Sequence, residues 1–409
     1  MKLKFAVLAT WLLAGGLVSC ADSSLDLAEG GMSGTGISVG AITGFGSVYV
    51  NGIHFNVDQA TFYRDGSAVD SQDNYSLGEL VTVTGSISVD GNNGNATVVE
   101  FESLVRGVIT QPSTDGNRVE VMGQTVGTDR LTVLQGASAL TGLALGDLVE
   151  ISGVPDAEGN IQASSIRLLV ADQGTGTQPL EVKGSIAQLS TAEQRFTLGQ
   201  LSVDYRQATL PDTPLSNGLQ VRVETDSAVM NRVVQASSIR LVDRRHYLAD
   251  SNVRLEGLVT KLESVSRFQI AGQQVVTTSA TRFRNLDSAG IRLNDNLEVD
   301  GIVNTAGELE ATEVKRGRAW HDGDDDDQHL NGILEAIDLV ARTVQVAGQL
   351  LHIDNASMLL TETAGRHQTL RLEELRIGDA VWIEFTTESD GTLRVLRLET
   401  GDHRRFSVH

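Results

Sequence analysis

The chain has 409 residues, of which 40% are hydrophobic and 21% are charged. That length exceeds the roughly 100–200 residues of one domain, and the hydrophobic share is enough to bury several cores, which excludes wholesale disorder. The 32 basic and 53 acidic residues give a formal net charge of −21, so the surface repels phosphate backbones and argues against nucleic acid as a partner. Cys20 is the single cysteine, which excludes an intramolecular disulfide.

The first residues predict an export signal. Two lysines precede an apolar run from Phe5 to Leu13, which is too short to span a bilayer. The next segment, Leu17-Val18-Ser19-Cys20, resembles the lipobox of bacterial lipoproteins. That resemblance implies a lipoprotein signal peptide over residues 1–19 and a diacylglyceryl group on the thiol of Cys20.

The residues after Cys20 predict a location and a tether. Ala21 follows the cysteine, which by resemblance to enterobacterial sorting signals favours the outer membrane. We therefore expect a protein of the bacterial cell envelope whose membrane contact is its N-terminal lipid. Residues 20–36 are rich in small residues and predict a flexible tether, since the glycine run Gly30–Gly36 lacks the Lys-Ser/Thr of a phosphate loop.

One sequence unit recurs five times along the rest of the chain. The heptapeptide Gln-Ala-Ser-Ser-Ile-Arg-Leu occurs at Gln162–Leu168 and again at Gln235–Leu241. Each copy opens with an apolar strand around a glycine, at Gly40, Gly107, Gly184, Gly257 and Gly332. A strand of alternating apolar and polar residues then runs to a hairpin glycine, at Gly52, Gly123, Gly199, Gly272 and Gly348.

The second half of each unit begins with a Gly-Asp-like turn. It is clearest in Leu145–Gly153 and in Leu77–Gly85, where the turn leads into a strand with one buried face. About five short strands per unit predict an all-β chain: a tandem array of five small, five-stranded barrels of the oligonucleotide/oligosaccharide-binding (OB) type. Open sandwiches are the alternative, but closure removes exposed strand edges. Because each closed unit covers its own core, we expect separate beads.

These units have predicted borders along the chain. We number them 1 to 5, with an acidic linker before the last: unit 1 at 37–103, unit 2 at 104–171, unit 3 at 180–243, unit 4 at 253–318, the linker at 319–328 and unit 5 at 329–400.

The repeated pattern points to a known family. The segment Gly40–Gly52 and the recurring Leu-x-x-Gly-Asp-x-Val-x-Val-x-Gly resemble bacterial envelope lipoproteins built from repeats of domain-of-unknown-function family 5666. Two units depart from the pattern, with Glu224-Thr225 and Glu384-Phe385 where the closing glycine should stand. The resemblance implies tandem barrel-like domains on a lipoprotein, and it supplies no catalytic residues to transfer.

The acidic linker is the first candidate site. Its carboxylates could bind a divalent cation, the one cofactor that the sequence suggests, through Asp322, Asp324, Asp325, Asp326 and Asp327. An EF-hand loop does not fit, because Asp327 or His329 falls at the required glycine, depending on the starting residue. A run of like charges is typical of a hydrated linker, and that interpretation is favoured over the cation site.

Aromatic residues are the second candidate. Phe45, Tyr49 and Phe55 cluster in unit 1, where an aromatic strand face could stack an oligomeric ligand. Core packing of Tyr49 and Phe55 is the favoured interpretation, because they occupy alternating strand positions. Trp382 lies between Val381 and Ile383, so we expect it to point outward as an exposed contact.

Several catalytic motifs are missing from the sequence: there is no His-Glu-x-x-His, Gly-x-x-x-x-Gly-Lys or Cys-x-x-Cys. We expect a non-enzymatic, lipid-anchored envelope protein that presents its barrels for binding or scaffolding, with a polysaccharide or an envelope protein as partner. The alternatives are a glycan-binding protein, a divalent-cation module at the linker, and a hydrolase that uses a pair of scattered carboxylates.

Overall fold

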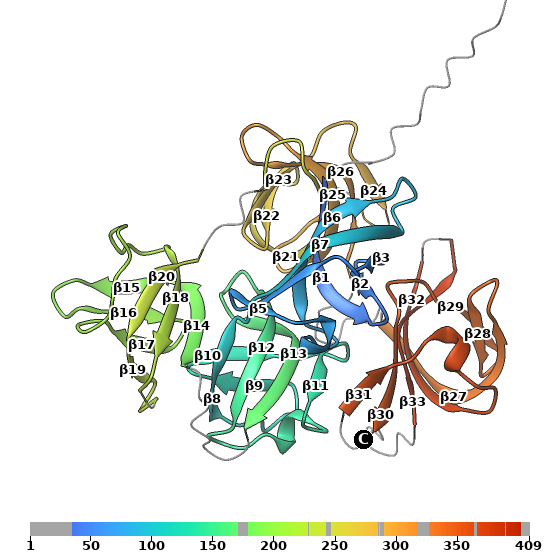
Figure 1. The fold of residues 1–409 in the computed structure, drawn as a ribbon, viewed down its shortest axis with the longest axis horizontal. Coiled ribbons are helices and arrows are strands. Elements are labelled where there is room, and N and C mark those ends of the chain that lie inside the picture. The colour runs from blue at the N-terminus through green and yellow to red at the C-terminus, as the bar shows by residue number, and fades with distance from the viewer. Residues whose placement is uncertain are drawn as a thin grey trace, which may run out of the picture. The chain divides into compact units, whose positions relative to one another are not determined.

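A computed structural model of the chain describes residues 35–170, 179–227, 229–242, 247–284, 286, 290–317, 327–363, 366–388 and 390–401. The described residues form strands joined by turns and short 3-10 helices (Figure 1). The predicted all-β class with small closed sheets is confirmed, while the finer OB type stays a prediction.

The strands follow one another in five groups. Unit 1 contains β1 (Thr35–Gly44), β2 (Val48–Val50), β3 (Ile53–Asn56), β4 (Thr61–Arg64), β5 (Ser67–Val69), β6 (Leu80–Ile87) and β7 (Asn93–Phe101). Unit 2 contains β8 (Val105–Gln111), β9 (Arg118–Val121), β10 (Gln124–Gly127), β11 (Val133–Gln135), β12 (Leu148–Pro155) and β13 (Ile161–Val170). Unit 3 contains β14 (Leu180–Ser185), β15 (Ala187–Ser190), β16 (Arg195–Leu198), β17 (Leu201–Asp204), β18 (Gln220–Thr225), β19 (Val233–Gln235) and β20 (Ser238–Leu241).

The last two groups repeat the same order. Unit 4 contains β21 (Asn252–Ser264), β22 (Arg267–Ile270), β23 (Gln273–Val276), β24 (Arg282–Arg284), β25 (Asn296–Val303) and β26 (Leu309–Arg316). Unit 5 contains β27 (Asp327–Asp338), β28 (Thr343–Val346), β29 (Gln349–His352), β30 (Met358–Thr363), β31 (Arg366–Thr369), β32 (Ala380–Thr387) and β33 (Leu393–Thr400). Because β27 begins at Asp327, the end of the predicted acidic linker is part of a strand.

Strand pairing closes a ring in units 1, 2, 4 and 5. In unit 1, β1 pairs with β2, β2 with β3, β3 in parallel with β7, β7 with β6, and β6 with β1 again. The equivalent strands pair in the same order in units 2, 4 and 5. In unit 3 the strands divide into two sheets, one of β14, β18 and β20 and one of β15, β16, β17 and β19.

Two backbone hydrogen bonds recur in every unit and join the first strand to the Gly-Asp-like turn. In unit 1, the N–H of Gly78 donates to the carbonyl of Ile42, and the N–H of Ile42 donates to the carbonyl of Glu79, both at 2.9 Å. The same pair forms between Gly146, Asp147 and Ile109, between Gly218, Leu219 and Ile186, between Asn294, Asp295 and Val259, and between Gly378, Asp379 and Leu334. The turn residue has a positive φ in all five, which explains the glycine, or the tolerated asparagine, at that position.

The closing glycine of the unit has a steric cause. Gly153 lies at a register shift between β12 and β13, and a Cβ there would lie 2.1 Å from the carbonyl oxygen of Gln162. Gly85 and Gly301 meet equivalent carbonyls at 2.0 and 2.4 Å. In unit 3, which has Glu224-Thr225 instead, β18 and β20 pair without such a shift. Unit 5 keeps a register shift between Glu384 and Phe385 without a glycine, so glycine is required only where a carbonyl oxygen approaches the Cβ position, as it does at Gly85, Gly153 and Gly301.

The units are not separate beads, so that expectation is wrong. β1 pairs in parallel with β21, which joins units 1 and 4, and β8 pairs with β14, which joins units 2 and 3. The core of units 2 and 3 is one hydrophobic cluster, and Met358 and Leu360 of unit 5 belong to the core of unit 1. After a ring has closed, part of its first strand still has one edge without a partner inside the unit. A strand of a neighbouring unit pairs with that edge in β1 and in β8.

Buried ion pairs join units 1 and 2. Arg64 of β4 contacts both Glu79, at 2.8 Å, and Glu150 of unit 2, and all three side chains are buried or nearly so. Arg106 of unit 2 donates to Asp65 at 2.6 Å. Since an unpaired buried charge is costly, each partner constrains the position of the other unit.

A second charged cluster lies where units 2 and 3 meet. Glu181 of β14 lies 3.3 Å from Arg222 and 3.8 Å from Lys183, and Arg106 is its strand partner. Burial raises the pKa of Glu181 above its ordinary value of 4.5, because the loss of solvation exceeds the attraction of the neighbouring cations.

Substitution Gly153→Ala tests the bulge. We expect a loss of about 1–3 kcal/mol in the free energy of unfolding, because the new methyl group overlaps the Gln162 carbonyl. Chemical denaturation measures the change. Gly142→Ala is the control, since a Cβ at Gly142 meets no atom within 4 Å, and equal stability of the two variants would contradict the steric explanation.

Substitution Glu181→Gln tests the buried carboxylate. Above pH 4.5 the folded chain retains this proton more tightly than the unfolded chain, so the contribution of Glu181 to stability falls as pH rises through the interval up to its folded pKa. We expect the stability of Glu181→Gln relative to wild type to increase from pH 4.5 toward neutrality. Denaturation at several pH values measures it, with the exposed Glu193→Gln as control. A difference that stays constant with pH would contradict the assignment.

Candidate functional site

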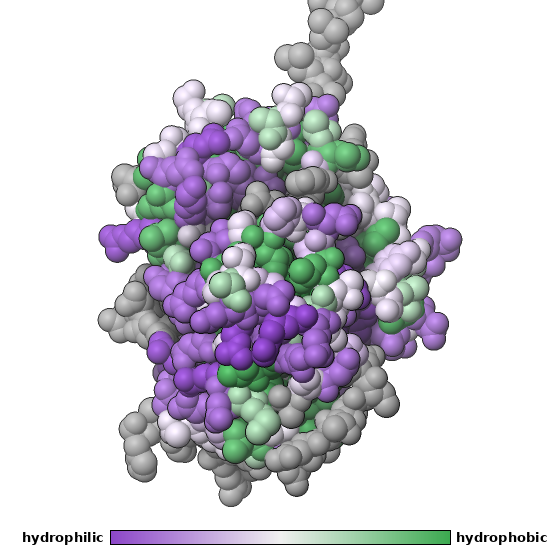
Figure 2. Space-filling model, turned by 90° about the vertical axis from the view of Figure 1, so that its left-hand side faces the viewer, coloured by the Kyte–Doolittle hydropathy of each residue, from purple (hydrophilic) through white to green (hydrophobic). Residues whose placement is uncertain are grey.

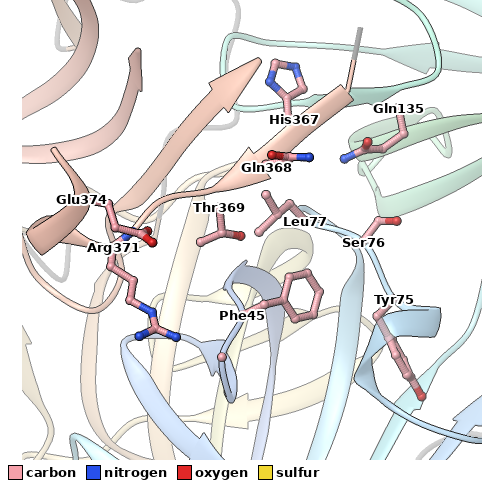
Figure 3. Close-up of a pocket in the computed structure, with 11 residues that line it drawn as sticks. Phe45, Tyr75, Ser76, Leu77, Gln135, His367, Gln368, Thr369, Arg371 and Glu374 are labelled. Atoms are coloured by element: carbon pink, nitrogen blue, oxygen red, sulfur yellow. The ribbon is translucent and has the colours of Figure 1, made fainter. Parts of the chain in front are cut away.

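A pocket of about 420 Å³ lies where units 1, 2 and 5 meet; we call it the junction pocket (Figure 3). Its volume falls within the range of about 300–1,000 Å³ that is common for small-molecule sites. Unit 1 contributes Phe45, Gly46, Tyr75, Ser76 and Leu77, unit 2 contributes Gln135, and unit 5 contributes His367, Gln368, Thr369, Arg371 and Glu374. Segments more than 300 residues apart in the sequence therefore share one pocket, as the contact of Thr43 with the carbonyl of Asn355 also shows.

The wall from unit 1 is built by a hairpin and a turn. Phe45 occupies the β1–β2 hairpin, where Gly46 has a φ of +101° that favours glycine. Ser76 and Leu77 follow the short 3-10 helix η1 (Gln72–Asn74) and lead into Gly78. Tyr75 points away from the pocket, because its hydroxyl donates to the carbonyls of Tyr63 and Val99 at 2.6 and 2.9 Å.

Arg371 brings a cation to the pocket. It precedes the 3-10 helix η4 (Leu372–Glu374), and its backbone N–H donates to Glu374 Oε2 at 2.7 Å. The guanidinium extends toward the β1–β2 hairpin, where its Nη2 lies 3.3 Å from the place of a Cβ on Gly46. Among the described residues, the guanidinium forms no ion pair with a carboxylate.

A chain of polar contacts holds the wall from unit 5. His367 Nδ1 lies 3.3 Å from Glu399 Oε1, and Arg397 Nη2 donates to the other carboxylate oxygen at 3.0 Å. Arg397 Nη1 in turn donates to the carbonyl of Arg130 in unit 2 at 2.8 Å. The contacts fix β31 and β33 against unit 2, so the pocket wall is positioned by its neighbours.

The remaining polar groups point into the same space. The amide groups of Gln135 and Gln368 approach each other from units 2 and 5 (Figure 3). The hydroxyl of Thr369 is buried and has no hydrogen-bond partner among the described residues. Glu374 is the single carboxylate among the described lining residues, whereas a carboxylate-based hydrolase needs two that face each other.

A second groove, of about 770 Å³, lies on unit 1 alone. Its lining includes the polar residues His54, Asn56, Asn93, Asn95 and Thr97, together with Ile87. Tyr49 stacks on His54 with the ring centroids 4.6 Å apart. Figure 2 shows one face of the molecule, where hydrophilic side chains surround small hydrophobic patches.

Phe45, Tyr49 and Phe55, the aromatic residues predicted to cluster in unit 1, differ in their burial. Phe45 lines the junction pocket and is half-buried. Phe55 is fully buried as expected, but Tyr49 lies outside the core, because Val48 and Val50 on either side of it take the inward positions. Tyr49 belongs to neither the core nor the lining of the junction pocket.

The expectation that Trp382 is exposed is wrong. It is 7% exposed, and every residue from Val381 to Phe385 is buried. The outer face of β32 is covered because Arg397 and Glu384, a cross-strand pair, both contact Arg130 of unit 2. Alternation identified the outward face correctly, but a neighbouring unit covers it.

The other predicted sites lie largely beyond the described residues. Cys20, Asp322, Asp324, Asp325 and Asp326 fall outside them, and Asp327 begins β27. Within the described segments, no group of three or more His, Cys, Asp or Glu side chains is arranged to hold a metal ion. The same segments contain no helix long and apolar enough to cross a membrane.

Sequence reasoning missed most of the junction pocket. Gln135, His367, Gln368, Thr369 and Arg371 stand in no motif, and their residue types are common on protein surfaces. Phe45, which lies between two glycines, is the one lining residue that the sequence predicted as a ligand contact. The pocket forms where three units pack together. The sequence pattern of one unit does not predict which other units will pack against it.

The chain repeats a small all-β unit, and three of these units share a polar pocket. These features define a tandem-repeat all-β protein. The family described as "Domain of unknown function (DUF5666)" matches residues 38–100, 106–167 and 256–315, which lie in units 1, 2 and 4. Three DUF5666 matches therefore lie in tandem along the chain, and the resemblance noted in its sequence is confirmed. No curated protein matches the sequence.

Several solved structures show distant similarity. A fimbrial biogenesis protein, PilY2 of Pseudomonas aeruginosa, is 14% identical, with 21% of this chain and 90% of that chain covered and a TM-score of 0.16. The Drosophila Unr segment CSD456 is 13% identical over 54% of this chain and 97% of its own, with a TM-score of 0.14. A multidomain protein with nucleic acid binding domains from Streptococcus pneumoniae is 12% identical over 53% and 72%, with a TM-score of 0.15. At these TM-scores the similarities identify no shared ligand.

Proposed function

We propose that this protein is a lipid-anchored protein of the bacterial cell envelope, in which the barrels form one scaffold that binds a ligand in the junction pocket. The carrying observation is the pocket itself, whose lining comes from units 1, 2 and 5. A chain of independent beads would have no such site. The scaffold therefore gives the repeats a joint function that one copy lacks.

Two further observations support binding over catalysis. Most of the polar groups of the lining are neutral amides and hydroxyls, which orient a ligand by hydrogen bonds, and Glu374 has no second carboxylate beside it among the described lining residues. The net charge of −21 opposes a polyphosphate ligand. The arrangement suits a polar organic ligand of the envelope, such as a glycan.

The anchor is supported by the sequence around Cys20. A diacylated cysteine inserts two acyl chains, each worth about 0.8 kcal/mol per buried methylene group, so attachment would be stable. The anchor would keep the binding scaffold close to the envelope surface.

Substitution Cys20→Ser tests the anchor. After growth with a fatty acid that carries a clickable group, we expect label on the wild-type chain and none on Cys20→Ser, because the thiol is the acceptor. Gel fluorescence and the mass of the N-terminal peptide measure it, with Ser24→Ala as control. Equal labelling of wild type and Cys20→Ser, or an unlabelled wild type, would contradict the proposal.

A photo-crosslinking amino acid at Gln368 tests the pocket as a ligand site. Gln368 is exposed and lines the pocket, so irradiation of intact cells should attach an envelope molecule to the protein there. Val340, which is 95% exposed and outside the pocket, carries the crosslinker in the control. Mass spectrometry identifies adducts. An adduct of the same kind and yield at both positions, or none at Gln368, would argue against a pocket ligand.

A further inference from the structure

We propose that the junction pocket recognises a carboxylate-bearing sugar of an acidic saccharide, with Arg371 as the partner of the carboxylate. The inference rests on the proposed function of the pocket and names its ligand class. The pocket brings together an unpaired cation, a set of neutral hydrogen-bonding groups and an aromatic ring.

The cation defines the charge of the ligand. Buried arginines at the unit borders are paired, as Arg64 is with Glu79 and Glu150 and as Arg254 is with Asp300. Arg371 is exposed, lines the pocket and pairs with no carboxylate among the described residues. The planar guanidinium donates two parallel hydrogen bonds to a carboxylate, so a single carboxylate matches it well.

The neutral groups define the rest of the ligand. The amides of Gln135 and Gln368 and the hydroxyls of Ser76 and Thr369 each supply or accept hydrogen bonds. Vicinal sugar hydroxyls, which also donate and accept, can satisfy such a set.

The aromatic ring supplies an apolar surface. Phe45 borders the pocket from the hairpin of unit 1, and its ring lies beside Leu77 (Figure 3). A pyranose ring has an apolar face of C–H groups that packs on an aromatic ring, while its edge carries the hydroxyls. A ligand with one flat apolar face, several hydroxyls and one carboxylate therefore fits all three walls.

The same groups argue against multiply charged ligands. The lining offers Arg371 as its one permanent cation among the described residues, and Glu374 beside it repels a second negative group. A nucleotide or a phosphorylated lipid headgroup carries more negative charge than this lining can neutralise. One uronic acid residue matches the available charge.

The test uses the full-length chain in detergent and two probes that differ only in charge. Methyl galacturonoside carries one carboxylate on one sugar ring, and its methyl ester is the neutral match. By calorimetry we expect the acid to bind roughly tenfold to a hundredfold more tightly than the ester, as a charge-assisted hydrogen bond predicts. Arg371→Gln should abolish this preference, and Arg371→Lys should restore part of it. Phe45→Ala should weaken both probes alike.

Controls make the outcome decisive. Arg376→Gln removes an exposed arginine of the same loop that does not line the pocket, and it should leave the preference unchanged. Thermal unfolding verifies that each variant folds. If neither probe binds, if acid and ester bind equally, or if Arg376→Gln acts like Arg371→Gln, the saccharide assignment is wrong. An adduct at Gln368 in cells with no uronate binding would overturn this inference and leave the pocket as a site for another ligand.

Discussion

A reciprocal pair of backbone hydrogen bonds ties the first strand of each unit to the turn before its long fourth strand, and the fold depends on it. The pair forms in all five units, at donor–acceptor distances of 2.7–3.0 Å. It needs a turn residue with positive φ, which accounts for Gly78 and its equivalents. The pair fixes one point of the first strand against the turn. In units 1, 2, 4 and 5 the first strand also pairs with the hairpin and with the strand after the turn, which closes a local ring, whereas unit 3 keeps the hydrogen-bond pair but divides its strands into two sheets.

Closure leaves charged and polar groups on the outer faces of the strands, and these faces join the units. Arg64, Glu79 and Glu150 are buried together between units 1 and 2, where each charge compensates another. Residues equivalent in the repeat thus take different roles. Leu77 before the turn of unit 1 is 3% exposed beside unit 2, whereas Leu145 and Ile377 at the same place in units 2 and 5 are 62% and 67% exposed. Duplication supplied one sequence pattern, and packing gave the copies unequal surroundings.

The junction pocket depends on these differences between the surroundings of the copies. Its hairpin wall is specific to unit 1, because Gly44-Phe45-Gly46 does not recur at the equivalent hairpins. Its opposite wall is set by contacts from His367 through Glu399 and Arg397 to the backbone of unit 2. A site of this kind can change with one copy while the other copies keep the scaffold folded.

The sequence by itself determined the strands, the turns and the resemblance to DUF5666 repeats. These follow from local requirements: period-two alternation, glycines with positive φ and a bulge that excludes a Cβ at Gly153. Tertiary structure alone decided that the units share strands and cores, that Trp382 is covered, and that Gln135, Thr369 and Arg371 meet in one pocket. The physical reason is that alternation specifies which face of a strand points out of its own barrel. Whether water or another barrel covers that face depends on contacts between residues hundreds of positions apart, which no local pattern encodes.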